Sequence, residues 1–491
     1  MDVQKAMRSS AKWSLLTEII SKIVTPLTGM LLARLLEPSA FGVLASLLVV
    51  TSFAEMFADS GLQKYLVQHN FKNNEDLEAG FNVAAYTSAG IAIIIWLIIV
   101  SFATPIAELL SSVDLAFPLQ VMSVGIILES FNGVQMAIFK RNFRFDLLFR
   151  LRMMVIFIPL VITIPCALLG YGYWSLIFGT LSRQLVTCIF QARYCPCHLQ
   201  WYYSWKVLYK MLSFSLWSLV EAISIWLTSW GGFFVAGLVL ESYYLGLFRG
   251  GLILSGTIFG LVTAPIIPIF FSALSRLQTD EAEFSNTFFD VQRKVAFVAG
   301  GIGIVMFSFP DFIVSVALGE QWREIKFFVG LLGVTDCISV SVNSLASEAL
   351  RAKGMPMLSC FSQILYFPVK LLAIYFLASY GFDVMAIGVC ICSIYLDLIK
   401  LVLLHKYISL PVGNILGNIA VPNSTLLMVS GFVIAYRNYV WDYKESYIIV
   451  IIEMLITLII YLGIMSNFKE YRYIERRMFQ QIVYRLKKGI F

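Results

Sequence analysis

Residues 13–16 read Trp-Ser-Leu-Leu, and residues 217–220 read Trp-Ser-Leu-Val. Three further pairs match at the same offset along the chain: Glu37 with Glu241, Gly42 with Gly246, and Leu48 with Leu252. A second island follows at nearly this offset, where Tyr171-Gly172-Tyr173 and Gly179 match Tyr380-Gly381-Phe382 and Gly388. Several matches in the same order predict two homologous halves, as in transporters built from internal repeats.

The composition places the chain in a membrane. Of its 491 residues, 59% are hydrophobic and only 13% are charged, whereas a soluble surface needs about a quarter or more charged residues. The apolar residues come in runs of about twenty, which can cross a hydrocarbon core about 30 Å thick. The first run is too long for the apolar region of a signal peptide, so we expect it to remain as an anchor.

We expect an all-α polytopic membrane protein with about 14 transmembrane helices, in two parallel six-helix lobes plus two C-terminal helices. The first lobe, residues 1–212, has spans near 10–34, 41–66, 81–103, 116–138, 150–170 and 173–195. The second lobe, residues 213–415, has spans near 213–237, 243–271, 291–317, 326–348, 357–379 and 382–405. Residues 416–491 add spans near 419–436 and 446–466 and a basic tail.

The distribution of the basic residues predicts the orientation of the chain in the membrane. Loops on the side of the two termini hold 27 Lys and Arg residues, including the seven in the tail from Lys469 to Lys488. The opposite loops hold only 4 basic residues: Arg323, Lys326, Arg437 and Lys444. The positive-inside rule therefore places both termini in the cytoplasm.

The short loops and the absent motifs limit the chemistry. No loop has room for a nucleotide-binding domain, and the GxxxxGK[ST] motif of ATP binding does not occur. No nucleophile elbow or zinc-helix motif occurs either, so we expect a transporter and not an enzyme. Energy must then come from the substrate's own gradient, the membrane potential or an ion gradient, with H+ or Na+ as the coupling ion and no other cofactor.

One cluster, Cys195-Pro196-Cys197-His198, contains metal-ligand types. Three ligands within four residues cannot close a tetrahedral zinc site, and no second cluster completes it. We therefore expect no metal.

Basic residues inside spans are candidates for binding an anionic substrate, because an isolated charge in a low dielectric must be compensated. These candidates are Lys22, Arg34, Arg183, Arg249 and Lys370. Arg34 and Arg249 lie nearer to span ends, from which long side chains can reach water. If the five converge on one cavity, they suit a phosphate-bearing molecule.

Acidic residues inside spans are candidates for ion coupling: Glu18, Glu55, Asp59, Glu129, Glu221, Asp336 and Asp397. Glu18 and Lys22 lie four residues apart and can neutralise each other, or belong to a gating helix bent at Pro26. Glu55 and Asp59 have the same spacing and can share a proton, hold sodium, or pair with a basic residue. The remaining acids can be coupling groups or satisfied structural groups.

Motifs at the turns resemble those of one family. Trp13-Ser14 and the stretch 35–42, Leu-Leu-Glu-Pro-Ser-Ala-Phe-Gly, resemble the R-x-L-x-P-x-x-F-G turn of the polysaccharide transporter branch of the multidrug/oligosaccharidyl-lipid/polysaccharide exporter superfamily. Other turns similar to those of this branch are Asp59-Ser60-Gly61-Leu62, Leu66-Val67-Gln68, Lys140-Arg141-x-Phe143, Gly319-Glu320-Gln321-Trp322 and Arg351-Ala352-Lys353-Gly354.

The resemblance implies a Wzx-type flippase for O-antigen, colanic-acid or capsule repeat units in a bacterial inner membrane. Such a protein moves undecaprenyl-pyrophosphate-linked oligosaccharide from the cytoplasmic to the outer leaflet by alternating access. The resemblance also implies a cationic central cavity and a lipid tail held by spans thirteen and fourteen. The implied partners are the lipid-linked oligosaccharide, membrane lipids, a polysaccharide polymerase and a chain-length regulator, but no nucleic acid.

Two other functions are alternatives to a flippase. A cation-coupled drug or cation antiporter of the same superfamily would use the acidic residues as its site; the polysaccharide-branch turns and the two extra C-terminal spans argue against it. A membrane polymerase or glycosyltransferase needs a large exposed catalytic loop, and the outer loops here have only a few residues.

Overall fold

The computed structural model describes residues 20–21, 24–59, 62–69, 71, 73–110, 113–142, 144–440, 447–468 and 471. All the regular structure in these ranges is helical, which confirms the all-α prediction. The helices form two compact units, Met1–Arg249 and Gly250–Phe491, and each unit is described by itself.

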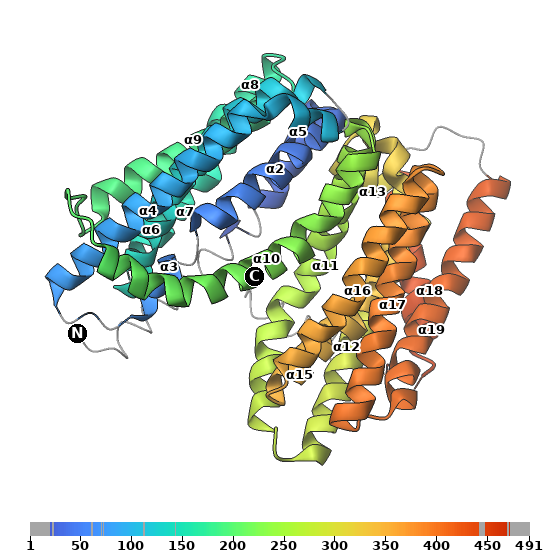
Figure 1. Ribbon diagram of the computed structural model, residues 1–491. Helices are drawn as coiled ribbons and strands as arrows, with labels where there is room; N and C mark the ends of the chain where they lie inside the picture. Colours follow the sequence, from blue (N-terminus) through green and yellow to red (C-terminus); the bar gives the residue numbers. More distant parts are fainter. Residues whose placement is uncertain are drawn as a thin grey trace, which may run out of the picture. The chain divides into compact units, whose positions relative to one another are not determined.

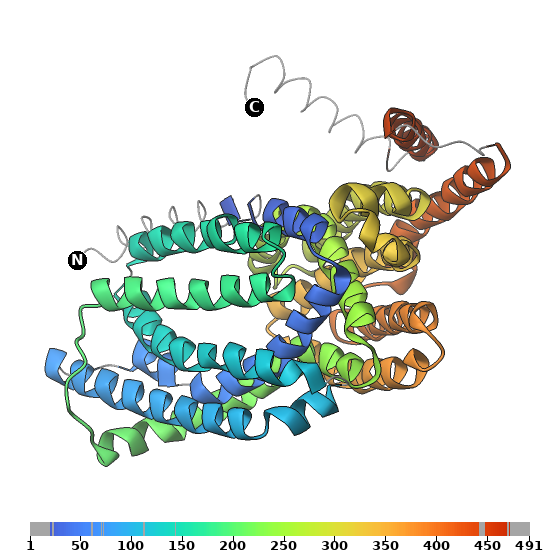
Figure 2. The same ribbon diagram turned by 90° about the horizontal axis from the view of Figure 1, so that it is seen from above.

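The first unit is built around one central helix, α6 (Ala116–Arg141), which packs against α2, α3, α4 and α9 (Figures 1 and 2). The other helices of this unit are α2 (Pro38–Asp59), α3 (Leu62–Gln68), α4 (Asn74–Ser101), α5 (Ala103–Leu109), α7 (Phe145–Ile158), α8 (Ile164–Leu168), α9 (Tyr173–Tyr194) and α10 (Trp205–Val239). A π-helix, η2 (Pro159–Thr163), joins α7 to α8. Helix α11 (Ser242–Arg276) begins in this unit and ends in the next.

In the second unit α12 (Glu281–Ser308) has the central position and packs against α14, α18 and α19. The remaining helices are α13 (Pro310–Ala317), α14 (Lys326–Ser339), α15 (Leu345–Ala352), α16 (Pro356–Ala378), α17 (Phe382–Ile408), α18 (Val412–Val440) and α19 (Tyr447–Met465). A π-helix, η4 (Val340–Ser344), joins α14 to α15 within one span. Helices α16 and α17 form an adjacent pair (Figure 1).

Within the described ranges, 11 helices are long and apolar enough to cross a membrane. The three other predicted spans are near 10–34, 173–195 and 213–237. The end of the first falls on the shorter apolar helix Val24–Leu35, residues 10–19 of it lie outside the described ranges, and the other two fall on α9 and α10. The chain is therefore a multi-pass membrane protein, and the exact number of fourteen stays a prediction.

The packing units do not end where the predicted lobes end. Helix α10 packs against α2, α3 and α4, so it belongs to the first unit together with the start of α11. The predicted lobes follow from residues that match along the sequence, whereas the two units are defined by which helices pack together. The lobe ranges 1–212, 213–415 and 416–491 therefore stay a prediction.

Matched positions of the sequence repeat have the same local role. Gly172 (φ 52°) and Gly381 (φ 112°) directly precede α9 and α17, at a left-handed backbone position that favours glycine. Further along these helices, a Cβ atom built on Gly179 would overlap the side chain of Thr163, and one built on Gly388 would overlap that of Leu377. Both glycines thus allow the helix to pack closely on the span that precedes it.

Another matched pair meets face to face. A Cβ atom built on Gly42 of α2 would overlap the carbonyl oxygen of Ser242, and one built on Gly246 of α11 would overlap that of Pro38. Since Pro38 corresponds to Ser242 in the repeat, this crossing is a pseudo-symmetric contact between equivalent helix starts. Only glycine allows two backbones to approach so closely.

We expect Gly42→Ala and Gly246→Ala each to lower the free energy of unfolding by about 1–3 kcal/mol, because the added methyl group must push one helix backbone from the other. Thermal unfolding of the full chain in detergent measures the effect. Gly256→Ala is the matched control, since Gly256 lies on the same helix as Gly246 and a Cβ there meets nothing within 4 Å. Equal stability of all three variants would contradict the close crossing.

Candidate functional site

A polar cavity of about 390 Å³ lies within the first unit, among α2, α3, α6 and α9. Two of the predicted coupling residues line it, Glu55 from α2 and Glu129 from α6. Their side chains are half-buried. The structure thus brings together two carboxylates that are 74 residues apart in sequence.

Two amide side chains connect these carboxylates. Gln184 Nε2 on α9 donates a hydrogen bond to Glu55 Oε1 at 3.3 Å. Asn132 Nδ2 donates to Glu129 Oε2 and to the Gln184 carbonyl oxygen, each at 3.2 Å. Asn132 and Gln184 are buried, and among the described residues neither Asn132 Oδ1 nor Gln184 Oε1 has a hydrogen-bond partner.

This arrangement is suited to holding a small cation. Carboxylate and amide oxygens are the ligands that hard cations prefer, and two neighbouring carboxylates can also share one proton. Arg183, one residue before Gln184, is exposed and lies close enough to Glu55 to attract its charge. The predicted basic residue Arg183 therefore lies near the acidic cavity.

A second charged cluster lies in the second unit. Ser255 Oγ of α11 donates a short hydrogen bond to Asp336 Oδ2 of α14. The charge of Lys370 on α16 also acts on Asp336, and Lys370 Nζ lies 5.7 Å from the centre of the Tyr366 ring. The predicted cation Lys370 thus has an acidic neighbour.

Asp397 on α17 is buried, with 2% of its surface exposed. Ser339 Oγ, one turn beyond Asp336 along the same span, donates a hydrogen bond to Asp397 Oδ2 at 2.8 Å. The backbone N–H of Asn343 also interacts with this carboxylate. Asp397 therefore belongs to the same polar region as Asp336.

Arg249 on α11 has an environment that suits an anion. The guanidinium carbon Cζ lies 5.8 Å from the centre of the Trp230 ring. Within the described ranges, the buried Nη1 of Arg249 has no hydrogen-bond partner. A buried N–H of a charged group with no partner is costly, and an anionic ligand would satisfy it.

The structure describes only some of the other predicted site residues. Glu18 and Lys22 lie outside the described residues, as do the side chains of Asp59 and Glu221. Arg34 is exposed near the end of the helix Val24–Leu35. Convergence of the five basic candidates stays a prediction.

Lys400 was not among the predicted site residues. Its side chain is completely buried, although Lys400 is one of the 27 basic residues assigned to the cytoplasmic side. Its position inside the predicted span 382–405 was the available signal. The amides Asn132 and Gln184 were also missed, because neutral residues give no charge signal in an apolar span.

The cysteines and the histidine of the cluster at 195–198 lie in different surroundings. Cys195 and Cys197 are buried in the core of the first unit, whereas His198 is exposed. No group of three metal-ligating His, Cys, Asp or Glu side chains occurs among the described residues.

Comparison with known sequences gives a family and named relatives. Residues 31–326 match the profile of a family described as "Polysaccharide biosynthesis protein". The chain is 25% identical over 397 residues to an uncharacterised membrane protein in the cps region of Klebsiella pneumoniae, covering 78% of this chain and 79% of that protein. It is 25% identical over 341 residues to the succinoglycan biosynthesis transport protein ExoT of Rhizobium meliloti, covering 67% and 66%. It is 20% identical over 365 residues to the lipopolysaccharide biosynthesis protein WzxC of Escherichia coli, covering 72% and 71%.

Comparison with solved structures shows the fold. The lipid II flippase MurJ in an inward closed conformation superposes with a TM-score of 0.71 at 13% identity, over 94% of this chain and 99% of that chain. An inward-facing multidrug resistance MATE transporter of the same exporter superfamily gives a TM-score of 0.60 at 14% identity, over 79% and 94%. These matches confirm the superfamily fold that the turn motifs predicted.

The Asp336–Lys370 pair can be tested with a double-mutant cycle. We expect Lys370→Met and Asp336→Asn each to destabilise the protein, because each leaves a charge without its neighbour, and the double variant to recover part of the loss. The expected coupling energy is about 0.5–3 kcal/mol. Thermal unfolding in detergent measures it, and strictly additive effects would show that the two charges do not interact.

Proposed function

We propose that this chain, which belongs to the polysaccharide biosynthesis protein family, is a flippase for lipid-linked oligosaccharide in a bacterial inner membrane. The observation that carries the proposal is the family match over residues 31–326. The polysaccharide-transport names of the relatives and the flippase fold agree with it. The cargo is an undecaprenyl-pyrophosphate-linked repeat unit, both termini are cytoplasmic, and the chain transports without catalysing a reaction.

The charged part of the cargo would be bound by basic residues. Arg249 supports this role, because its buried Nη1 lacks a partner and a pyrophosphate oxygen can accept from it. Lys370 is a second candidate, and its neighbour Asp336 would modulate its attraction for phosphate. Arg34, Arg183 and Lys22 remain further candidates for the same task.

The apolar part of the cargo would lie beside the last helix. An apolar groove of about 500 Å³ runs along α12 and α19 and is lined by Phe297, Gly301, Val305, Leu458 and Leu462, among others. Tyr461 also lines the groove, and its hydroxyl donates a hydrogen bond to the Phe297 carbonyl oxygen at 2.8 Å. An isoprenoid chain gains from such burial as any hydrocarbon does.

A cation-coupled antiporter is the second candidate function. The observation in its favour is the cavity with Glu55 and Glu129, where two buried amide oxygens lack partners within the described part of the chain. In a flippase this cavity would bind the coupling ion, whereas in an antiporter it would bind the transported cation as well. The two functions therefore differ in cargo and not in the presence of the site.

Deletion of the gene separates these functions. We expect loss of one surface polysaccharide and accumulation of lipid-linked single repeat units in the cytoplasmic leaflet, because synthesis continues while transfer stops. Mass spectrometry of extracted lipids and staining of the surface polymer measure both effects. Normal polymer together with increased drug sensitivity would support the antiporter and contradict the flippase.

Arg249→Gln tests the anion site. A charge-assisted hydrogen bond contributes about 1.5–3 kcal/mol, so we expect the apparent affinity for lipid-linked oligosaccharide to fall about tenfold or more. Transport by the purified full chain in vesicles measures this. Arg276→Gln is the matched control, since Arg276 is exposed at the end of the same helix. Equal affinities of the two variants would remove Arg249 from the site.

A further inference from the structure

A polar pocket of about 740 Å³ lies at one end of the second unit. Four elements line it: the short helix α13, the 3₁₀ helix η3 (Glu320–Ile325), the last turn of α18 and the first turn of α19 (Figure 1). The charge asymmetry predicts that this end faces the outside of the membrane, because Arg323 and Arg437 belong to the outer loops. The pocket shares no lining residue with the apolar groove along α12 and α19.

The backbone around the pocket is fixed by local packing. Gly319 has a φ of 105°, a left-handed position that favours glycine, and it directly precedes η3. Trp322 on η3 is buried, and a Cβ atom built on Gly250 of α11 would overlap its ring. Arg437 Nη1 donates a hydrogen bond to the Ser308 carbonyl oxygen at 3.4 Å, which joins the end of α18 to the end of α12. The pocket is therefore largely formed before a ligand binds, which lowers the cost of binding.

The charged side chains of the pocket balance one another. Arg323 Nε and Lys326 Nζ lie 3.8 Å and 3.1 Å from Asp311 Oδ1. Arg437 Nε lies 3.9 Å from Glu453 Oε2. A phosphate site needs positive charge in excess, whereas paired acids and bases offer acceptors and donors side by side. This arrangement suits a neutral ligand rich in hydroxyl groups, because each hydroxyl both donates and accepts.

Aromatic rings line the same pocket. The ring centres of Phe312 on α13 and Tyr447 on α19 lie 5.9 Å apart, and 59% of the surface of Tyr447 is exposed. A sugar ring has a face of C–H groups, which packs against the electron-rich face of an aromatic ring. Its hydroxyl groups then point toward polar side chains around the ring, which here include Ser315 and Glu320. The pocket thus combines the aromatic surface and the hydrogen-bonding groups that a sugar ring requires.

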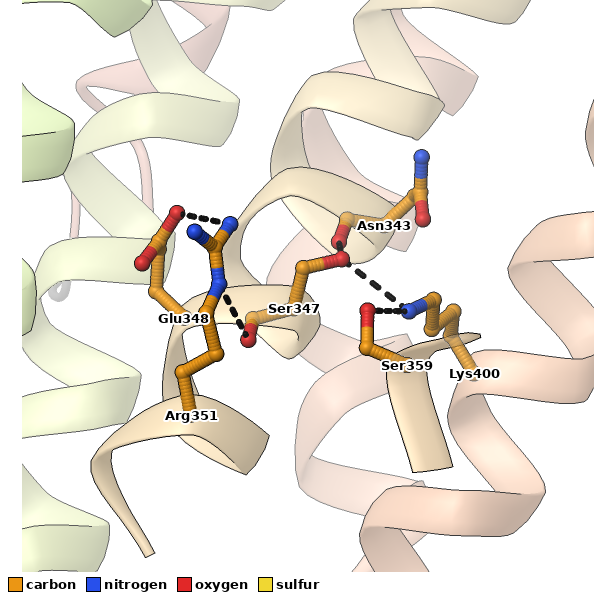
Figure 3. A network of polar contacts seen from close by, with 6 residues as sticks. All are labelled: Asn343, Ser347, Glu348, Arg351, Ser359 and Lys400. Atoms are coloured by element: carbon orange, nitrogen blue, oxygen red, sulfur yellow. Dashed lines mark hydrogen bonds and ion pairs between the residues drawn. The ribbon is translucent and has the colours of Figure 1, made fainter. Parts of the chain in front are cut away.

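The charged groups at the other end of this unit are arranged differently. Lys400 on α17 is completely buried and donates hydrogen bonds to Ser359 Oγ at 2.7 Å and to Ser347 Oγ at 3.0 Å (Figure 3). Beside them, Arg351 Nη2 binds Glu348 Oε1 at 2.6 Å. These groups satisfy one another between packed helices and so stabilise the fold. The charged groups at the outer end line a cavity instead, where a ligand can reach them.

The pocket adjoins the apolar groove along α12 and α19. On α13, Ile313 lines the groove, while its neighbours Phe312 and Val314 line the pocket. On α19, Val450 lines the pocket, and Leu458, about 12 Å further along the helix, lines the groove. A polar pocket beside an apolar groove matches a molecule that has a sugar at one end and a hydrocarbon chain at the other.

We propose that this pocket is an exit site, which binds the sugar end of the lipid-linked oligosaccharide on the outer side of the membrane while the lipid chain lies in the groove. A sugar ring packs on Tyr447, and Glu320 and Arg323 bind its hydroxyl groups. The inference rests on the proposed flippase function. It adds the place where the cargo is held between its transfer and its release into the outer leaflet.

The first test measures affinity by saturation-transfer NMR, which detects the C–H groups of a weakly bound sugar. The purified full chain in detergent receives repeat-unit oligosaccharide, released by partial acid hydrolysis from the surface polysaccharide of the same strain. We expect Tyr447→Ala to raise the dissociation constant about tenfold, because the packing surface is lost. Tyr436→Ala is the matched control, since Tyr436 is exposed one residue before Arg437 and does not line the pocket. Displacement of the oligosaccharide by inorganic pyrophosphate would show an anion site and overturn the inference.

The second test locates the pocket in the membrane. Ser315→Cys places a thiol in the pocket, and Glu324→Cys places one at an exposed position of η3 outside it. Spheroplasts are treated with a membrane-impermeant maleimide, and the unsubstituted chain gives the background of the native cysteines. We expect both variants to be labelled. Oligosaccharide at ten times its dissociation constant should slow labelling of Ser315→Cys about tenfold and leave Glu324→Cys unchanged.

The outcomes separate the exit site from the flippase. Equal dissociation constants of the wild type and Tyr447→Ala, no labelling of either cysteine variant, or labelling of Ser315→Cys that the oligosaccharide does not slow would each overturn the exit site. Accumulation of lipid-linked repeat units in the deletion strain would in that case leave the flippase intact. Normal polymer in the deletion strain, together with protection of Ser315→Cys, would overturn the flippase and support a sugar-binding pocket.

Discussion

The cost of placing an ionised side chain in a low dielectric governs the interior of this protein. Several of the described acids and bases inside the spans have a polar neighbour from a different helix. Gln184 reaches Glu55, Ser255 reaches Asp336, and Ser347 and Ser359 reach Lys400. These hydrogen bonds connect helices that otherwise contact each other through apolar side chains. They also hold ionisable groups at depths where the membrane would exclude water.

Close helix packing complements these polar contacts. At Gly42 and Gly246 the repeat-related helices α2 and α11 approach until their backbones touch. The hairpins that end in α9 and α17 use matched glycines in the same way, at Gly179 and Gly388. The scaffold is therefore repetitive, whereas the charges are not: Lys22 corresponds to Trp226, Arg34 to Leu238 and Arg249 to Ala45.

The helices were largely predictable because each apolar run is long and bounded by short polar turns. The predicted spans 173–195, 357–379 and 382–405 agree with α9, α16 and α17 to within a few residues. The site was predictable only as a set of candidates. Glu55 and Glu129 were named separately, but a charge pattern contains no information on which helices pack together, and the neutral partners Asn132 and Gln184 leave no signal in it.

The sequence alone determined the membrane class, the repeat and the orientation expected from 27 basic residues against 4. These follow from hydropathy and charge, which are summed along the chain and need no knowledge of contacts. Only the tertiary structure decided that Lys400 is buried against hydroxyl groups and that Asp336 and Asp397 belong to one polar region. The reason is that burial and hydrogen bonding depend on neighbours from other helices, and those neighbours are chosen by packing.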